Sequence, residues 1–229
     1  ARLLLLGAIG FAAYRTDLFF GSSVTNEMRE PLGEAKALIA TLNFGAGTIK
    51  LGSLPEGSAS LVEGSFQTNS RGVKSTISRS GESVRLTLER DGPRFFIGSI
   101  TEDWDVKLSR AVDIDLTVNA GASDVGLDME ELKVTNLRLK AWASDVSVVL
   151  PAQAERTVAR LEVGAADLDV RVPSGVAARI HAEAGLASVN VDESRFPKIG
   201  DYYQSPDYNT ASHRVELEIR GGVADITVR

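Results

Sequence analysis

Residues 114–127, IDLTVNAGASDVGL, contain the pattern that decides the fold of this chain. Apolar and polar residues alternate on both sides of the small residues AGAS, and alternation with a period of two is typical of a half-buried β-strand. Glycine inside such a pattern indicates a sharp bend or the close approach of another backbone. The stretch therefore predicts two strands that meet at a tight corner.

The same unit recurs along the chain. Its other copies are IATLNFGAGTIKL at 39–51, LRLKAWASDVSVVL at 137–150, LEVGAADLDVRV at 161–172, IHAEAGLASVNV at 180–191 and LEIRGGVADITV at 217–228. Aligned on the corner, Asp124, Asp145, Asp167 and Ser188 are 21, 22 and 21 residues apart, and Asp225 follows after 37. This period, without helical periodicity, predicts a β-solenoid with about 21 residues per coil, each coil stacking its strands on those of the next.

The corner calls for Gly, Ala or Ser, because successive backbones pass within strand spacing there. Trp142 departs from this rule, so we expect it to point outward or to fill a wider corner. Residues 60–67, 73–78, 83–89 and 103–109 also alternate but lack the corner. We expect them to form the wider first part of the same domain, because no linker-like stretch separates them from the repeats.

The first twenty residues differ in composition from the rest. Residues 3–14, LLLLGAIGFAAY, carry no charge, but as a helix they span about 18 Å against about 30 Å for a bilayer core. Because the chain starts with Ala1 rather than Met, we expect this to be the last part of a membrane helix, with Arg15 and Asp17 at the interface. The residues expected to associate with the membrane are Leu3, Leu4, Leu5, Leu6, Ile9, Phe11, Phe19 and Phe20.

Two other interpretations of this segment stay open: a helix buried in the protein core, and a retained signal peptide. The resulting domain organisation has three parts. Residues 1–20 form a membrane-associated segment, residues 21–36 form a linker with mixed charge, Gly and Pro, and residues 37–229 form one all-β domain.

The order of these steps resembles a known family. NFGAGTIKLGSL, LVEGSF, DWDVKLS, NAGASDVGLD, LPAQ, VPSG and EAGLASV follow one another as in the toastrack domain, the adhesin-like and LiaF-like all-β module of bacterial membrane-anchored proteins. The resemblance covers residues 37–229, including the tail from Phe196 onward. It implies a β-solenoid joined to transmembrane helices, often in envelope-stress signalling, with no characterised catalytic motif.

Composition excludes several function classes. Apolar residues make up 43% and charged residues 24%, which excludes a disordered chain. The net charge is 25 − 31 = −6, which gives no general reason to bind nucleic acid. The chain has no cysteine, so thiolate metal sites and cysteine nucleophiles are excluded. It also lacks the GxSxG elbow and the phosphate-binding loops, and we expect no cofactor.

The corner aspartates allow two interpretations. Asp124, Asp145 and Asp167, stacked about 4.8 Å apart, could bind Ca²⁺ through oxygen ligands. Alternatively, each carboxylate accepts backbone N–H bonds at its own turn. The two histidines, His181 and His213, lack the spacing of a zinc site.

Residues 194–213 interrupt the repeat with about 16 extra residues and contain Phe196, Tyr202, Tyr203 and Tyr208. Loops of this length are usually functional or disordered, and Tyr is favoured at interfaces. The four rings either fold back on the flank of the solenoid or present a surface to a partner, and both can hold together.

These patterns indicate a non-enzymatic scaffold attached to a bacterial membrane, with its soluble domain on one face, the extracytoplasmic face being favoured. The expected partners are other membrane or envelope proteins, in a hetero-oligomeric complex of which this chain is an accessory or structural subunit. Two alternatives stay open: a LiaF-like regulator of envelope stress, and an enzyme acting on envelope polysaccharide.

Overall fold

The computed structural model describes residues 24–68, 72–91, 102–186 and 188–229. This part of the chain is all-β and holds no helix, which confirms the all-β class that the sequence predicted. The short apolar helix expected at the start lies outside the described residues, and so do all eight residues expected to associate with the membrane.

The strands follow the expected repeats closely. In chain order they are β1 (Val24–Pro31), β2 (Ala37–Ser53), β3 (Ser60–Thr68), β4 (Val73–Ser80), β5 (Ser83–Arg90), β6 (Glu102–Leu108), β7 (Asp113–Asp128), β8 (Lys133–Val149), β9 (Arg156–Arg171), β10 (Ala177–Ala184), β11 (Val189–Val191), β12 (Lys198–Ile199), β13 (Tyr202–Gln204), β14 (Arg214–Val223) and β15 (Ile226–Val228). The strands expected without a corner are β3 to β6.

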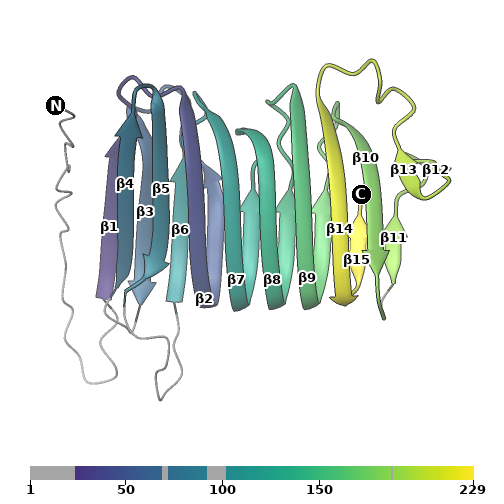
Figure 1. The fold of residues 1–229 in the computed structure, drawn as a ribbon, viewed down its shortest axis with the longest axis horizontal. Helices are drawn as coiled ribbons and strands as arrows, with labels where there is room; N and C mark the ends of the chain where they lie inside the picture. The colour runs from purple at the N-terminus through teal and green to yellow at the C-terminus, as the bar shows by residue number, and fades with distance from the viewer. Residues whose placement is uncertain (1–23, 69–71, 92–101, 187) are drawn as a thin grey trace.

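Four long strands, β2, β7, β8 and β9, run through both layers of the molecule (Figure 1). The first half of β2 pairs with β5 and its second half with β6, both in parallel. In the same way β9 pairs with β14 through its first half and with β15 through its second. The first sheet therefore has the order β4-β5-β2-β7-β8-β9-β14-β10-β13-β12, and the second sheet β1-β3-β6-β2-β7-β8-β9-β15-β11.

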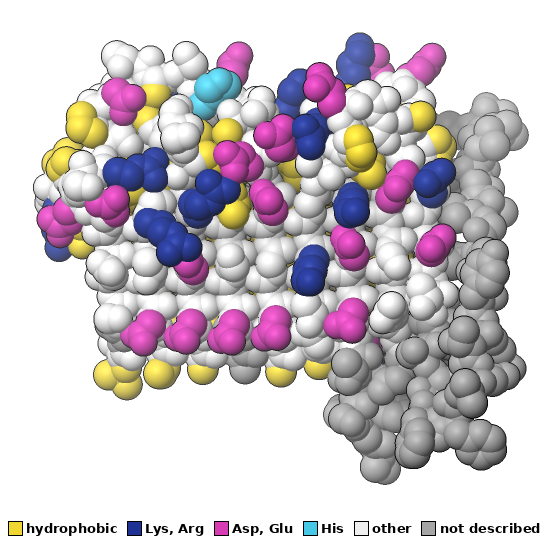
Figure 2. Space-filling model, turned by 180° about the vertical axis from the view of Figure 1, so that it is seen from behind, with side chains coloured by type: hydrophobic (Ala, Val, Ile, Leu, Met, Phe, Trp, Pro, Cys, Tyr) yellow, Lys and Arg dark blue, Asp and Glu magenta, His cyan; other side chains and the backbone are white. Residues whose placement is uncertain are grey.

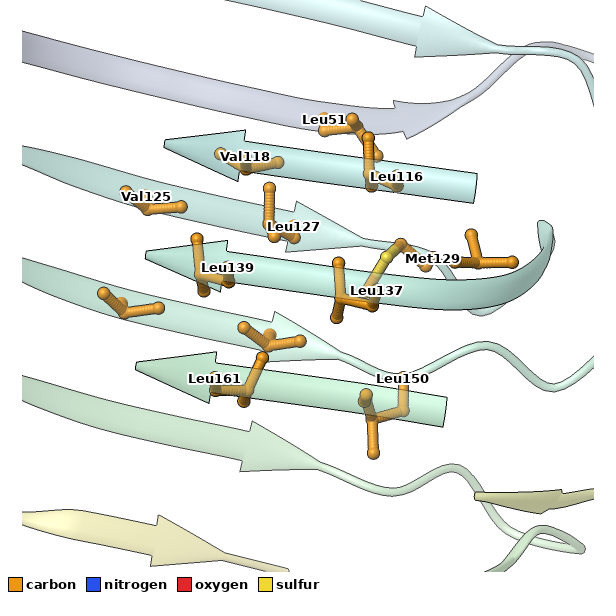
Figure 3. Packing of buried hydrophobic residues seen from close by; sticks show 14 of the residues in the cluster. Leu51, Leu116, Val118, Val125, Leu127, Met129, Leu137, Leu139, Leu150 and Leu161 are labelled. Atoms are coloured by element: carbon orange, nitrogen blue, oxygen red, sulfur yellow. The ribbon is translucent and has the colours of Figure 1, made fainter. Parts of the chain in front are cut away.

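The repeat places equivalent residues next to one another. Leu116 pairs with Leu137, and Leu139 pairs with Leu161. Buried leucines and valines of successive long strands thus form rows that face each other between the two sheets (Figure 3). These side chains are almost completely excluded from water, and burying each one contributes about 1.5–3 kcal/mol.

The alternation changes phase at the corner. In β7 the buried residues Leu116 and Val118 have even numbers, whereas Val125 and Leu127, after the corner, have odd numbers. Because a shift of one residue turns every following side chain to the other face, this change keeps apolar side chains inside after the strand has bent. The break in the alternation of apolar and polar residues therefore marks the position of the corner in the sequence.

The backbones approach closely at these corners. A Cβ added at Gly121 would lie 2.2 Å from the carbonyl oxygen of Gly45, and one added at Gly164 would lie 2.5 Å from that of Trp142. Trp142 itself is 70% exposed. The Trp142 side chain therefore points outward, which is one of the two arrangements expected for it. Small residues are needed at the corners only where the backbone of a neighbouring strand passes close by.

Residues 24–31 form a strand where a linker was expected. β1 pairs antiparallel with β3 along its whole length and forms one edge of the second sheet. Met28 and Glu30 are buried, and Arg79 of β4 forms a salt bridge of 2.6 Å with Glu30. The mixed charge that suggested a linker is instead typical of an edge strand, where charge prevents pairing with other chains.

The coils also do not follow one another in simple sequence order. β14 lies between β9 and β10, because Val215 pairs with Thr157 on one side and with Ala178 on the other. In space, β14 and β15, which come last in the chain, therefore lie between β9 and the pair β10 and β11. Residues 192–213 make this possible, since they carry the chain from the end of β11 back to the start of β14.

Part of this connection covers the edge of β10. Phe196 and Tyr208 are buried, whereas Tyr202 and Tyr203 are half-buried in β13, which pairs antiparallel with β10. Arg179 lies over the rings of Tyr202 and Tyr208, at 5.4 and 4.6 Å from their centroids. The four rings thus fold back on the flank, as one of the two interpretations had it.

Two corner glycines give a matched test of the close approach. Gly121→Ala should lower the free energy of unfolding by about 1–3 kcal/mol, because its Cβ would collide with the backbone of Gly45 in the neighbouring strand β2. Gly45→Ala, at the neighbouring corner, should be nearly neutral, because nothing lies within 4 Å of the added Cβ. Urea unfolding followed by tryptophan fluorescence measures both. Equal stabilities of the two variants would contradict the corner geometry.

Candidate functional site

The corner aspartates line up on the outer face of the second sheet. Asp145 pairs directly with Asp167, and Asp124 lies opposite Thr48 on one side. The pairs Ala122–Ala143 and Val125–Val146 place Asp124 opposite Asp145 on the other side. Successive corners therefore hold equivalent aspartates, as predicted.

The row continues through the inserted coil. Ile226 pairs with Leu168 on one side and with Val189 on the other, so Asp225 lies between Asp167 and Ser188. We name Asp124, Asp145, Asp167 and Asp225 the aspartate row. Figure 2 shows evenly spaced acidic side chains crossing this face of the molecule.

Most of the aspartate row has no partner within the protein. Asp124, Asp145 and Asp167 are exposed, and in the part of the chain that the structure describes they form no hydrogen bond or salt bridge. Asp225 differs, because it accepts hydrogen bonds of 2.7 Å from the hydroxyl and 3.4 Å from the backbone N–H of Ser188. The Ser188 hydroxyl in particular holds the pKa of Asp225 below its usual value.

Neither of the two interpretations of the aspartates holds for this row. Asp124, Asp145 and Asp167 do not accept backbone N–H bonds at their turns, because their side chains project from the outer face of the bent strands. Among the described residues there is also no group of three or more acidic or histidine side chains that could hold a metal ion. In a straight row the carboxylates lie side by side and do not converge on one point.

The outer face of the first sheet shows the opposite arrangement. There, charges on neighbouring strands pair with each other across the coils. The pairs are Lys140–Glu162 at 2.8 Å, Arg156–Glu216 at 2.8 Å, Arg160–Glu218 at 3.3 Å and Arg138–Asp115 at 3.3 Å. The fold therefore can align opposite charges in neighbouring coils, and along the aspartate row it does not.

Three large apolar side chains are exposed at the corners of the long strands. Trp142, Val223 and Leu186 are 70%, 60% and 81% exposed. Leu186 donates its N–H to the carbonyl of Gly222 and so lies beside Val223. Trp142 belongs to another corner, where it continues the exposed positions of Arg138 and Lys140 on the first sheet. We name these three residues the apolar corner. Hydrophobic side chains fringe the acidic row in Figure 2.

A shallow groove of about 620 Å³ crosses the same face. Its lining includes the aspartate row together with Asp169 and Lys50, so five aspartates and one lysine surround it. Asp169 is paired with Arg229 at 2.7 Å. The groove is thus acidic overall, and none of the three residues of the apolar corner is among its lining residues.

Sequence reasoning did not identify the apolar corner as a surface. A signal existed for it, because Trp142, Val223 and Leu186 stand beside or within corners where Gly and Ala are otherwise the rule. The partner-binding role expected for Phe196, Tyr202, Tyr203 and Tyr208 stays a prediction. Phe196 and Tyr208 are buried, so only the half-buried rings of Tyr202 and Tyr203 could contact a partner. Within the described ranges, no helix is long and apolar enough to cross a bilayer.

Comparison with solved structures identifies a protein with a similar fold. A candidate cell adhesion protein from Clostridium sporogenes superposes with a TM-score of 0.82 at 18% identity, over 89% of this chain and 97% of that chain. A candidate adhesin from Bacteroides fragilis is matched over 90% of this chain and 97% of that chain, at 9% identity and a TM-score of 0.34, too low to support an argument. No curated protein matches the sequence.

The family comparison agrees with the resemblance in the sequence. Residues 20–171 match the model of the N-terminal domain of toast_rack, DUF2154. This match covers the bent strands β2, β7, β8 and β9 and the strands that precede and separate them. On this match, and with the fold of the Clostridium structure, the chain belongs to the toast-rack family.

Proposed function

We propose that this chain is a non-enzymatic interaction domain of a membrane-attached protein, a β-solenoid scaffold that binds other envelope proteins. The observations that carry the proposal are the aspartate row on the second sheet, where Asp124, Asp145 and Asp167 have no partners among the described residues, and the exposed apolar side chains at the corners. Exposed apolar residues grouped on one edge are typical of interaction sites.

Two further observations support this proposal. The Clostridium structure that shares the fold is described as a candidate cell adhesion protein, which is a binding role. The uncharged stretch at residues 3–14 supports attachment to a membrane. A scaffold in an envelope complex needs both an anchor and a surface that the isolated domain leaves open.

The aspartate row is also costly for the isolated domain. Unit charges about 4.8 Å apart repel each other by about 0.9 kcal/mol in bulk water, and like charges directly opposite each other destabilise a sheet. Asp145 has such a neighbour on each side. A partner that neutralises the row would remove this repulsion, so the row is better explained by binding than by folding.

This repulsion predicts that Asp145→Asn stabilises the protein. The free energy of unfolding should rise by up to about 1 kcal/mol, more at low salt than at high salt, because two like-charge contacts are lost. Glu162→Gln on the first sheet makes the same change in charge but removes the salt bridge to Lys140, so its stability should fall slightly. Urea unfolding at two salt concentrations measures both, and destabilisation by Asp145→Asn would contradict the account of the row.

Photo-crosslinking in native membranes tests the function itself. A photo-reactive amino acid replacing Trp142, on the apolar corner, or Tyr203, in the loop, should link the full chain to another envelope protein in one discrete adduct. The same replacement at Thr117, on the outer face of the first sheet, should give none. If neither position 142 nor position 203 gives a crosslinked adduct with another protein, the proposal is wrong.

A further inference from the structure

We infer that His181 is a pH-dependent clamp, which in its protonated form fixes the hairpin of β12 and β13 to β10 and on losing its proton loosens that hairpin. The hairpin carries Tyr202 and Tyr203, the two half-buried rings of the loop. The inference rests on the proposed interaction function, because it adds pH control to one of the surfaces through which a partner would bind.

Both ring nitrogens of His181 face oxygens that accept hydrogen bonds and cannot donate them. Nδ1 lies 3.0 Å from the backbone carbonyl oxygen of Asp201, and Nε2 lies 3.1 Å from a carboxylate oxygen of Glu183. A neutral imidazole has one N–H to donate, whereas the imidazolium has two. Both contacts are therefore hydrogen bonds only when the ring is protonated, because a neutral ring leaves one of the two oxygens without a donor.

The contact with Asp201 holds the turn of the hairpin. Backbone pairing between β10 and β13 consists of two residue pairs, Arg179–Gln204 and Ile180–Tyr203. The turn between β12 and β13 lies beyond these pairs, and among the described residues its one hydrogen bond to β10 comes from the His181 side chain. Loss of this bond frees the turn without detaching the hairpin, because Arg179 still lies over the ring of Tyr202.

The surroundings of the ring favour the imidazolium. The hydrogen bond to Glu183 is the main reason that the pKa of His181 lies above its usual value, and the Asp201 carbonyl and the charge of Glu218 act in the same direction. Glu218 lies directly opposite His181 on β14. The charged groups on the elements around the ring are Arg179 and Glu183 on β10, Glu218 on β14 with its partners Arg160 and Arg220, and Lys198 and Asp201 on the hairpin.

The direction of the raised pKa sets the direction of the switch. Because the pKa of His181 is higher in the folded chain, the clamp is complete below about pH 6.5, the usual value for histidine, and is lost as the pH rises through the raised value. A fixed hairpin binds a partner at a lower entropic cost than a loose one. Partner binding through Tyr202 and Tyr203 should therefore weaken as the pH rises.

Hydrogen–deuterium exchange of the purified full chain tests the clamp without a partner. After correction for the intrinsic effect of pH on amide exchange, residues 198–204 should exchange at least about threefold faster at pH 8.5 than at pH 6. Strand β8 should show no such difference. In His181→Gln, which cannot be protonated, residues 198–204 should exchange equally at both pH values. A pH-independent wild type, or a pH dependence that persists in His181→Gln, would overturn the inference.

Two further variants locate the titrating group. Glu183→Gln should move the midpoint of the pH dependence to lower pH, because it removes the main cause of the raised pKa of His181. His213→Gln is the matched control: it removes the other histidine of the chain and that ring's contact with the carbonyl of Ala154, and should keep the wild-type pH dependence. An unchanged midpoint in Glu183→Gln would contradict the role of this carboxylate in the clamp.

Photo-crosslinking from position 203 in native membranes separates this inference from the proposed function. The yield of adduct should be lower at pH 8.5 than at pH 6, and this difference should disappear when His181→Gln is added. If exchange responds to pH but neither position 142 nor position 203 gives an adduct, the clamp stands and the proposed function fails. If the adduct from position 203 forms in equal yield at both pH values, the proposed function stands and the pH control of binding is overturned.

Discussion

Backbone hydrogen bonding between parallel coils is the constraint on which the rest of this structure depends. Each long strand must bend at the same point as its neighbours, because one offset residue would turn its apolar side chains to the solvent. At the bend, Gly121 and Gly164 leave room for the carbonyl groups of Gly45 and Trp142. Both the small corner residues and the change in alternation therefore follow from the requirement that neighbouring strands bend at the same point.

The same constraint arranges the surface in rows. Any residue type that recurs with the repeat must stack on its copies at strand spacing, whatever its charge. On the first sheet, Lys140 meets Glu162 and Arg160 meets Glu218, so the rows stabilise the fold weakly. On the second sheet the aspartate row repeats one charge, and the fold bears repulsion that a neutral side chain would avoid. This asymmetry between the two sheets is the main structural argument for a binding surface.

Much of the fold follows from the sequence alone. Alternation and small corner residues are local signals, and they placed β2 and β7 to β9 to within a few residues. The strand at residues 24–31 was missed, because only Met28 marks its buried face as apolar. The position of β14 between β9 and β10 was also missed, since near-identical coils fit one another in more than one order and no local pattern encodes which order is adopted.

Only part of the candidate site, likewise, could be predicted from the sequence. The alignment of Asp124, Asp145 and Asp167 follows from their spacing, whereas their lack of partners depends on which side chains neighbouring strands present. The aromatic loop could be recognised as an ordered feature from its rings, but the burial of Phe196 and Tyr208 is a property of the folded flank. Alternation predicts which face a residue takes, and contacts between coils decide what it meets there.

Carbodiimide labelling of carboxylates, read by mass spectrometry, tests most directly whether a partner covers the aspartate row. In the purified chain, Asp124, Asp145 and Asp167 should react as readily as Glu56, an exposed carboxylate in a turn away from the strands. In native membranes the three aspartates should be protected several-fold while Glu56 still reacts. Equal labelling of all four residues in membranes would show that the row stays open, and would contradict the account.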